Sequence, residues 1–239
     1  MSFAIPKASG FEAATQYKPE YRSPGGSLKR SLGMAPPVAE LVSTQPIVYN
    51  TLMLKDKIYT KRCHRYNVAG HAHELTFSCY HNQAFLSAER VCKYLVDSII
   101  SSREKHQFDL WAYIFMPNHV HLLICPRTEN YSISSILLSI KQPVSRRAIN
   151  YLKVNNRNGL KSLATHQTHR PYRFWQKGGG YDRNITKVST VVDSAHYLHN
   201  NPVRKGLVKS ADEWYYSSAA DWQGTGQGPI PVDFESFPT

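Results

Sequence analysis

The sequence predicts an α+β fold in which a small antiparallel sheet carries helices on one of its faces. Two patterns lead to this prediction. Residues 74–80 and 108–125 are strand-like, and the second stretch is divided at 116–118 by Met-Pro-Asn, which is typical of a tight turn. Residues 87–99 and 186–200 repeat apolar side chains every three or four positions, as amphipathic helices do.

The strand-like segments differ in their expected burial. In residues 74–80 apolar side chains alternate with polar ones, which predicts a strand with one buried face. Residues 108–115 are mostly apolar or aromatic, which is typical of a central strand. Residues 119–125 follow the predicted turn, so we expect them to pair with residues 108–115 as a β-hairpin.

Three helices complete the predicted fold. Ser87 is in position to cap the first helix, in which apolar residues recur every four positions. The second helix spans about residues 132–153 and contains Pro143, so a kink or two shorter helices are expected. The third helix spans residues 186–200 and is ended by Pro202.

The chain of 239 residues divides into three parts. Residues 1–69 are rich in proline and have few periodic apolar positions, which indicates a largely irregular N-terminal extension. Residues 70–222 hold all of the predicted strands and helices and are expected to form one domain. Residues 223–239 are expected to form a flexible tail.

Charge and hydropathy limit the classes of partner. The chain has 29 Lys and Arg against 17 Asp and Glu, a net charge of +12, which favours a polyanion, nucleic acid before a membrane surface. Its longest apolar run falls far short of the roughly 20 residues that span a bilayer, and no signal peptide is evident. We therefore expect a cytoplasmic protein, in which the four scattered cysteines are reduced thiols.

A pair of histidines lies in the predicted hairpin. Because side chains alternate along a strand, His119 and His121 project from one face and Val120 and Leu122 from the other. Two neutral imidazoles side by side can clamp a divalent cation. The alternative is that one or both histidines simply form hydrogen bonds across the sheet.

The last predicted helix places a tyrosine away from its apolar stripe. Val191, Val192 and Leu198 belong to that stripe, whereas Tyr197 lies near the opposite side and shares its face with Asn201. A phenol beside a metal-bound phosphodiester is a plausible nucleophile, and the phosphotyrosyl ester that it would form can be resealed. The alternative interpretation is an exposed surface tyrosine.

Basic and aromatic residues are interleaved between the histidines and this tyrosine. Lys and Arg neutralise phosphates, and aromatic rings stack on unpaired bases, so the segment favours nucleic acid over a merely solvated basic face. The residues that we expect to contact nucleic acid are Arg146, Arg147, Lys153, Arg173, Trp175, Lys177, Arg183, Arg204 and Lys205.

These motifs resemble those of a known family. Residues 115–123, Phe-Met-Pro-Asn-His-Val-His-Leu-Leu, resemble the HUH metal motif (His–hydrophobic–His) of single-tyrosine transposases. Residues 197–208, which contain Tyr-x-x-x-Asn-Pro-Val, resemble the REP-associated tyrosine transposase branch, as do residues 174–183 and 214–218. The resemblance covers roughly residues 70–222.

The resemblance implies a ferredoxin-like HUH nuclease fold, with helices packed on an antiparallel sheet. His119 and His121 match two ligand positions for Mg²⁺ or Mn²⁺, Asn201 matches the third, and Tyr197 matches the nucleophile. Members of the family cleave single-stranded DNA beside a hairpin through a 5′-phosphotyrosine intermediate and rejoin it, without a nucleoside triphosphate. The branch tends toward monomers, which favours a monomer here.

Three alternatives remain open at this stage. Tyr181 is a second candidate nucleophile, although it precedes the helix and lacks an amide partner four residues later. A domesticated nickase would use the same residues for a different biological role. A non-catalytic protein that binds nucleic-acid hairpins would use only the basic surface.

Overall fold

The computed structural model describes residues 65–178 and 180–238 of the chain. Nearly all of the predicted extension at residues 1–69 therefore lies outside the described residues. Within the described part, none of the helices combines the length and apolar character that a membrane crossing requires.

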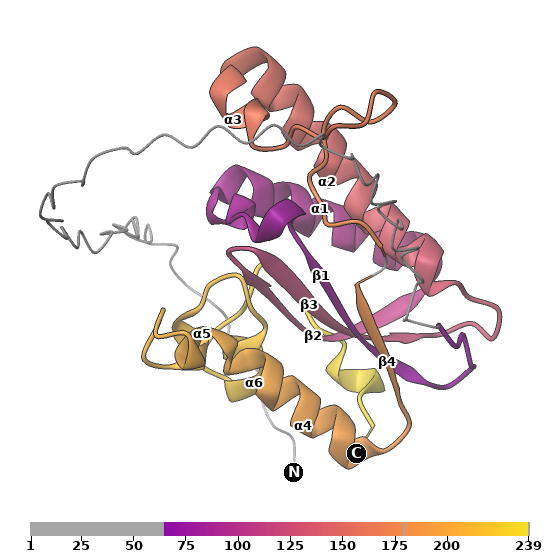
Figure 1. The fold of residues 1–239 in the computed structure, drawn as a ribbon. Coiled ribbons are helices and arrows are strands. Elements are labelled where there is room, and N and C mark those ends of the chain that lie inside the picture. The colour runs from indigo at the N-terminus through magenta and orange to yellow at the C-terminus, as the bar shows by residue number, and fades with distance from the viewer. Residues whose placement is uncertain (1–64, 179, 239) are drawn as a thin grey trace, which may run out of the picture. The chain divides into compact units, whose positions relative to one another are not determined.

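The centre of the domain is a four-stranded antiparallel sheet (Figure 1). Its strands are β1 (Ala72–Ser78), β2 (Phe108–Met116), β3 (His119–Pro126) and β4 (Tyr181–Ile185), in the spatial order β2-β3-β1-β4. The alternating segment β1 and the β2–β3 hairpin are confirmed, but β2 is an edge strand rather than the central strand expected from its apolar sequence. The fourth strand, β4, is absent from the prediction.

Helices cover both faces of the sheet, so the expectation of helices on one face is wrong (Figure 1). The helices α1 and α2 pack on one face and α4 packs on the other. The α-helices are α1 (Glu89–His106), α2 (Ile133–Asn155), α3 (Arg157–Lys161), α4 (Val188–His199), α5 (Asn201–Arg204) and α6 (Ala219–Gln223). Short 3₁₀ turns lie at Tyr80–Asn82, Phe85–Ser87, Ala211–Glu213 and Phe234–Ser236.

Two details of the predicted helices need correction. The N-cap of α1 is Ala88, which provides no side-chain hydrogen bond, rather than Ser87. Pro143 lies within α2, a single helix of 23 residues, so of the two alternatives expected for this proline, a kink or two shorter helices, the second is wrong. At the start of α2, Ser132 accepts a hydrogen bond from the backbone N–H of Ser135, which is the usual role of a serine cap.

The alternation of β3 divides its side chains between two cores. Val120, Leu122 and Ile124 are fully buried in the larger core, beneath α1 and α2. Leu123 projects to the opposite side and joins the smaller core beneath α4. Because His121 is two residues before Leu123, it faces α4 as well. The hydrophobic pattern of this strand therefore fixes the face on which its histidines project.

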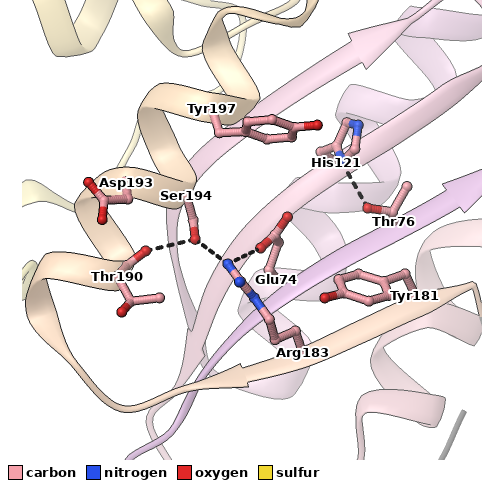
Figure 2. Close-up of a pocket in the computed structure, with 9 residues that line it drawn as sticks. All are labelled: Glu74, Thr76, His121, Tyr181, Arg183, Thr190, Asp193, Ser194 and Tyr197. Carbon is pink, nitrogen blue, oxygen red and sulfur yellow. Dashed lines mark hydrogen bonds and ion pairs between the residues drawn. The ribbon is translucent and has the colours of Figure 1, made fainter.

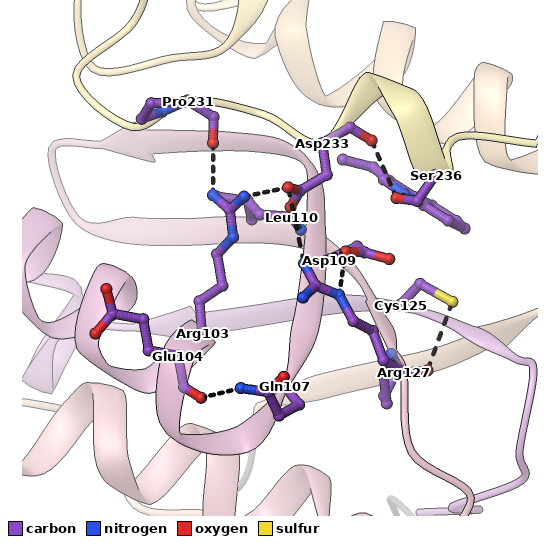
Figure 3. A network of polar contacts seen from close by, with 12 residues as sticks. Arg103, Glu104, Gln107, Asp109, Leu110, Cys125, Arg127, Pro231, Asp233 and Ser236 are labelled. Atoms are coloured by element: carbon purple, nitrogen blue, oxygen red, sulfur yellow. Dashed lines mark hydrogen bonds and ion pairs between the residues drawn. The ribbon is translucent and has the colours of Figure 1, made fainter.

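The C-terminal segment is packed against the domain, which contradicts the predicted flexible tail at 223–239. Ile230 is fully buried in the larger core. The Asp233 carboxylate forms an ion pair with Arg103 and accepts a hydrogen bond from the backbone N–H of Leu110, 2.8 Å away (Figure 3). The backbone of this segment also bonds to β2, because the N–H of Asp233 donates to the carbonyl of Leu110.

The outer edge of β2 is covered by other parts of the C-terminal region. The backbone N–H of Phe115 donates to the carbonyl of Tyr216, and the N–H of Ser218 donates to the carbonyl of Tyr113. Within the described sheet β2 has one neighbouring strand, β3, yet all nine of its residues are buried. The cover by the C-terminal region explains this burial. An edge strand protected in this way has few free backbone groups with which to pair another chain.

Candidate active site

The candidate site lies on the face of the sheet that α4 covers. The register places His121 opposite Thr76 on β1, and Thr76 opposite Tyr181 on β4. These three residues therefore form a row across three strands. A second row, two residues away on the same face, contains Leu123, Glu74 and Arg183.

A glycine allows β4 to start so close to β1. Gly180 has a φ of +74°, and a Cβ atom there would lie 1.9 Å from the carbonyl oxygen of Thr76. Any side chain at this position would push the start of β4 away from β1. Glycine therefore holds Tyr181 in the row with Thr76 and His121.

Both histidines are held by hydrogen bonds at Nδ1. His121 Nδ1 lies 2.8 Å from Thr76 Oγ1, and His119 Nδ1 lies 2.6 Å from the Oδ1 atom of Asn118. An amide oxygen can only accept, so Nδ1 of His119 carries the proton and Nε2 keeps its lone pair. Among the described residues, neither Nε2 atom has a hydrogen-bonding partner. The prediction of a same-face pair is confirmed by their ring centroids, 4.9 Å apart.

The surroundings keep both imidazoles neutral. Burial lowers the pKa of His121 to about 4, with further contributions from His119 and Arg204. Burial also lowers the pKa of His119, and the charge of Lys205 acts in the same direction. Neutral imidazole is the form that binds a metal ion. Arg204 and Lys205, two of the residues predicted to bind nucleic acid, therefore lie close enough to the histidines to lower their pKa values.

The apolar stripe of α4 explains why Tyr197 is exposed. Val191, Ala195 and Leu198 form the stripe that is buried against the sheet. Tyr197 lies outside this stripe and is 61% exposed, as its position on the helix predicts. Figure 2 shows its phenolic oxygen turned toward the imidazole of His121.

Arg204 contacts both the ring and the backbone of the exposed tyrosine. Its guanidinium carbon lies 4.0 Å from the centroid of the Tyr197 ring, and its Nη1 donates a 2.9 Å hydrogen bond to the carbonyl of the same residue. A cation in this position is attracted to the face of the ring. It also places a positive charge beside the phenol.

Asn201 begins the short helix α5, four residues after Tyr197. It is buried, and its side-chain N–H donates to the carbonyls of Leu198, at 3.1 Å, and Tyr197, at 3.5 Å. These bonds orient the amide and leave Oδ1 without a hydrogen-bonding partner among the described residues. The described residues contain no cluster of three His, Cys, Asp or Glu that could bind a metal ion, so a third protein ligand beside the histidines would have to be of another type.

A cavity of about 690 Å³ extends from His121 and Tyr197 toward β4 (Figure 2). The residues that line it are Glu74, Thr76, His121, Tyr181, Arg183, Thr190, Asp193, Ser194 and Tyr197. The cavity therefore joins one predicted metal ligand to both candidate nucleophiles. His119 and Asn201 lie outside its lining.

The other predicted nucleic-acid contacts are dispersed. Arg147 forms an ion pair with Asp97 on α1, and Arg173 donates to Gln167. Lys153 lines a second cavity of about 560 Å³. Arg146 and Lys177 are exposed on the surface.

Trp175 requires a correction. It is only 4% exposed, and its indole N–H donates to the carbonyl of Lys141 within the larger core. Its ring packs edge-on against Phe77, with centroids 5.0 Å apart. A ring buried in this way cannot stack on a base, so its presence in a basic segment was misleading.

Glu74 and Ser194 line the cavity but were not identified from the sequence. Arg183 donates to Glu74 Oε2 and to Ser194 Oγ, each at 2.7 Å. The signal for Glu74 was present, because it is an acidic residue on the face of β1 that also carries Thr76. Without β4, however, nothing in the sequence placed Arg183 opposite it.

The fold and this arrangement define an HUH-type protein, in which a histidine pair on a central strand lies beneath a helix that carries a tyrosine. A family model described as "Transposase IS200 like" matches residues 67–201. The chain therefore belongs to the IS200-like transposase family.

Two relatives belong to the REP-associated type. The chain is 26% identical over 139 residues to a Haemophilus influenzae protein provisionally named a REP-associated tyrosine transposase, covering 54% of this chain and 73% of that protein. The fold of this chain is similar to that of a REP-associated tyrosine transposase solved with a bound REP hairpin. The TM-score is 0.55 and the identity 19%, and the match covers 75% of this chain and 98% of the other.

Proposed function

We propose that this protein is a metal-dependent transposase that cleaves and rejoins single-stranded DNA beside a hairpin, with Tyr197 as the nucleophile. The observation that carries the proposal is that the Tyr197 phenol and the His121 imidazole line the same cavity, with the phenol turned toward the imidazole. Membership of the IS200-like family supports the same reaction class.

The residues present fit a divalent cation such as Mg²⁺ or Mn²⁺. His119 and His121 are neutral, are oriented through Nδ1 and keep Nε2 free, which is the usual arrangement of metal-binding histidines. Asn201 could contribute its amide oxygen as a third ligand. A bound cation would neutralise charge on the phosphate that is attacked.

The proposed reaction is a balanced exchange of ester bonds. The phenolic oxygen of Tyr197 forms a bond to phosphorus, the phenol gives up its proton, and the bond from phosphorus to the 3′-oxygen breaks. The departing oxygen takes up a proton, which leaves a 5′-phosphotyrosyl enzyme and a free 3′-hydroxyl group. A second 3′-hydroxyl can then attack the phosphotyrosyl ester and rejoin the DNA, and no nucleoside triphosphate is consumed.

We propose a DNA hairpin with a single-stranded flank as the partner. The net charge of +12 supports a nucleic acid, and the related protein of similar fold was solved with a REP hairpin. We also propose that the protein acts as a monomer, because its own C-terminal region bonds to the outer edge of β2.

The direct test is incubation with single-stranded DNA that carries a hairpin, in the presence of Mg²⁺ or Mn²⁺. We expect a covalent protein–DNA adduct, visible as a band of reduced mobility in a denaturing gel, which disappears with EDTA and in Tyr197→Phe. Tyr181→Phe is the matched control and should still form the adduct.

Each contrary result has a clear meaning. An adduct that persists in Tyr197→Phe but disappears in Tyr181→Phe would make Tyr181 the nucleophile. Hairpin binding with no adduct under any condition, unaffected by His119→Ala, would indicate a binding protein without this chemistry. Both results would contradict the proposal.

A further inference from the structure

The cavity continues beyond the candidate catalytic groups, toward β4. His121 and Tyr197 lie at one end, and Thr190, Asp193 and Arg183 extend the lining away from them. A phosphate held between the phenol and the imidazoles would occupy only the first part of this space. The remaining part could accommodate another portion of the substrate.

The far part of the cavity is unsuited to a second phosphate. Arg183, its only described Lys or Arg, donates to the carboxylate of Glu74 at 2.7 Å. Asp193 adds another carboxylate to the lining. An incoming phosphate would meet two acids and one cation that is already paired, in contrast to the strong positive charge of the chain as a whole. A neutral group that forms hydrogen bonds fits this environment better.

Glu74 and Arg183 present a fixed pattern of hydrogen-bonding atoms. Ser194 accepts from Arg183 and donates to the carbonyl of Thr190, each at 2.7 Å. The Nη2 atom of Arg183 therefore donates to two acceptors, Ser194 and Glu74. The second carboxylate oxygen of Glu74 has no hydrogen-bonding partner among the described residues, and Figure 2 shows it turned toward the Tyr197 side of the cavity. The other guanidinium nitrogens of Arg183 likewise lack a described partner. An acceptor thus lies beside free donors, as the edge of a nucleobase requires.

Tyr181 provides an aromatic ring at the same place. It is 51% exposed and lines the cavity, and it projects from the same face of β4 as Arg183, two residues later. Exposed aromatic rings stack on the bases of single-stranded nucleic acids whatever their identity. Stacking on Tyr181 would bring the edge of a base toward Glu74 and Arg183.

We propose that this part of the cavity binds one unpaired nucleobase next to the phosphate that is cleaved. The base stacks on Tyr181, and its edge is read by Glu74 and Arg183. This inference rests on the proposed function, because that function places the phosphate beside Tyr197. It assigns Tyr181 a role in substrate binding rather than in nucleophilic attack.

The test is a scan of abasic positions along the single-stranded flank of the hairpin substrate. The measured quantities are the affinity of the Tyr197→Phe protein for DNA and the rate of adduct formation by the unmodified protein. We expect one nucleotide adjacent to the cleavage position at which base removal weakens binding about 5- to 150-fold, the range for loss of one stacked base. Tyr181→Ala, added to Tyr197→Phe, should cause a similar loss and should make base removal at that nucleotide almost neutral.

Glu74→Gln tests whether the base edge is read. The substitution keeps the shape of the side chain but replaces a charged acceptor with an amide. We expect it to change the order of preference among the four bases at the sensitive nucleotide. Glu89→Gln, which alters an exposed acid on α1 paired with Lys93, is the matched control and should leave the order unchanged.

The outcomes separate this inference from the proposed function. Adduct formation without any abasic-sensitive nucleotide next to the cleavage position, or with an order of preference unchanged in Glu74→Gln, would overturn the base site alone. Absence of an adduct would overturn the proposed chemistry, while the affinity scan would still decide whether the cavity holds a base. The substitution Tyr181→Phe keeps the ring. If removal of the base still weakens binding in this variant, the result would support stacking.

Discussion

The hydrogen bond between His121 and Thr76 provides a quantitative test of the proposed metal site. Thr76 Oγ1 lies 2.8 Å from His121 Nδ1, on the side of the ring away from the free Nε2. Thr76→Val keeps the branched shape but removes the hydroxyl group, so the imidazole loses the hydrogen-bonding partner that fixes its orientation. Loss of such a partner typically weakens metal binding 10- to 100-fold, or about 1.4 to 2.8 kcal/mol.

The assay is a titration of the purified protein with Mn²⁺, followed by calorimetry or by electron paramagnetic resonance. Thr128→Val is the matched control, because Thr128 is exposed in the loop after β3 and its hydroxyl donates to the nearby carbonyl of Asn130. We expect the Kd for Mn²⁺ to rise in Thr76→Val and to stay unchanged in Thr128→Val. A change of less than about threefold in a folded Thr76→Val protein would refute the argument that His121 binds metal in the orientation set by Thr76.

Three further predictions concern stability and DNA binding. Ile230→Ala should lower the free energy of unfolding by about 2–5 kcal/mol in urea denaturation, because it empties a fully buried site; a change below about 0.5 kcal/mol would mean that the C-terminal segment is not part of the fold. Burial lowers the pKa of His199 to about 4, below the ordinary value near 6.5, so the unfolded state binds more protons and stability should fall as pH drops from about 6.5 to 4. That loss is at most about 3 kcal/mol, and His199→Gln, compared by thermal unfolding at several pH values, should show a flatter profile. Lys161→Gln, in the second cavity, should reduce the salt dependence of DNA affinity by a slope of about 0.7 if this lysine contacts one phosphate of a single strand; an unchanged slope between 50 and 200 mM salt would exclude that contact.

The parts of the fold that the sequence predicted are those specified by local patterns. The alternation of β1, the turn of the β2–β3 hairpin and the apolar stripe of α4 each depend on a few adjacent residues. The errors concern long-range packing. Except for Asp109, the residues of β2 are apolar or aromatic, because both faces of this strand and its outer edge are covered. The sequence alone could not distinguish such a covered edge strand from a central strand. The C-terminal segment contains several glycines and prolines, yet Ile230 is fully buried in the larger core, Val232 packs against it and Phe237 packs against the smaller core.

The candidate site was predictable to the extent that it follows from helix and strand periodicity. The same-face placement of His119 and His121 and the exposed position of Tyr197 required no tertiary information. Recognition of β4 was the missing step, because its residues alternate without an apolar face that is obvious in the sequence. As a consequence Glu74 was overlooked, and Arg183 was expected to bind nucleic acid without the carboxylate that pairs with it.

On this face of the sheet, β3 and α4 each contribute residues both to the smaller core and to the candidate site. On β3 the α4-facing side chains change from Leu123, which is buried, to His121, which borders the cavity. On α4 the buried stripe of Val191 and Leu198 lies beside Ser194 and Tyr197, which line the cavity. Each element is therefore anchored by apolar residues immediately beside its polar ones, so the packing that stabilises the domain also fixes where the phenol and the imidazole meet. A rearrangement that separated them would have to disturb the core beneath α4, which is why we expect the candidate site to be preorganised.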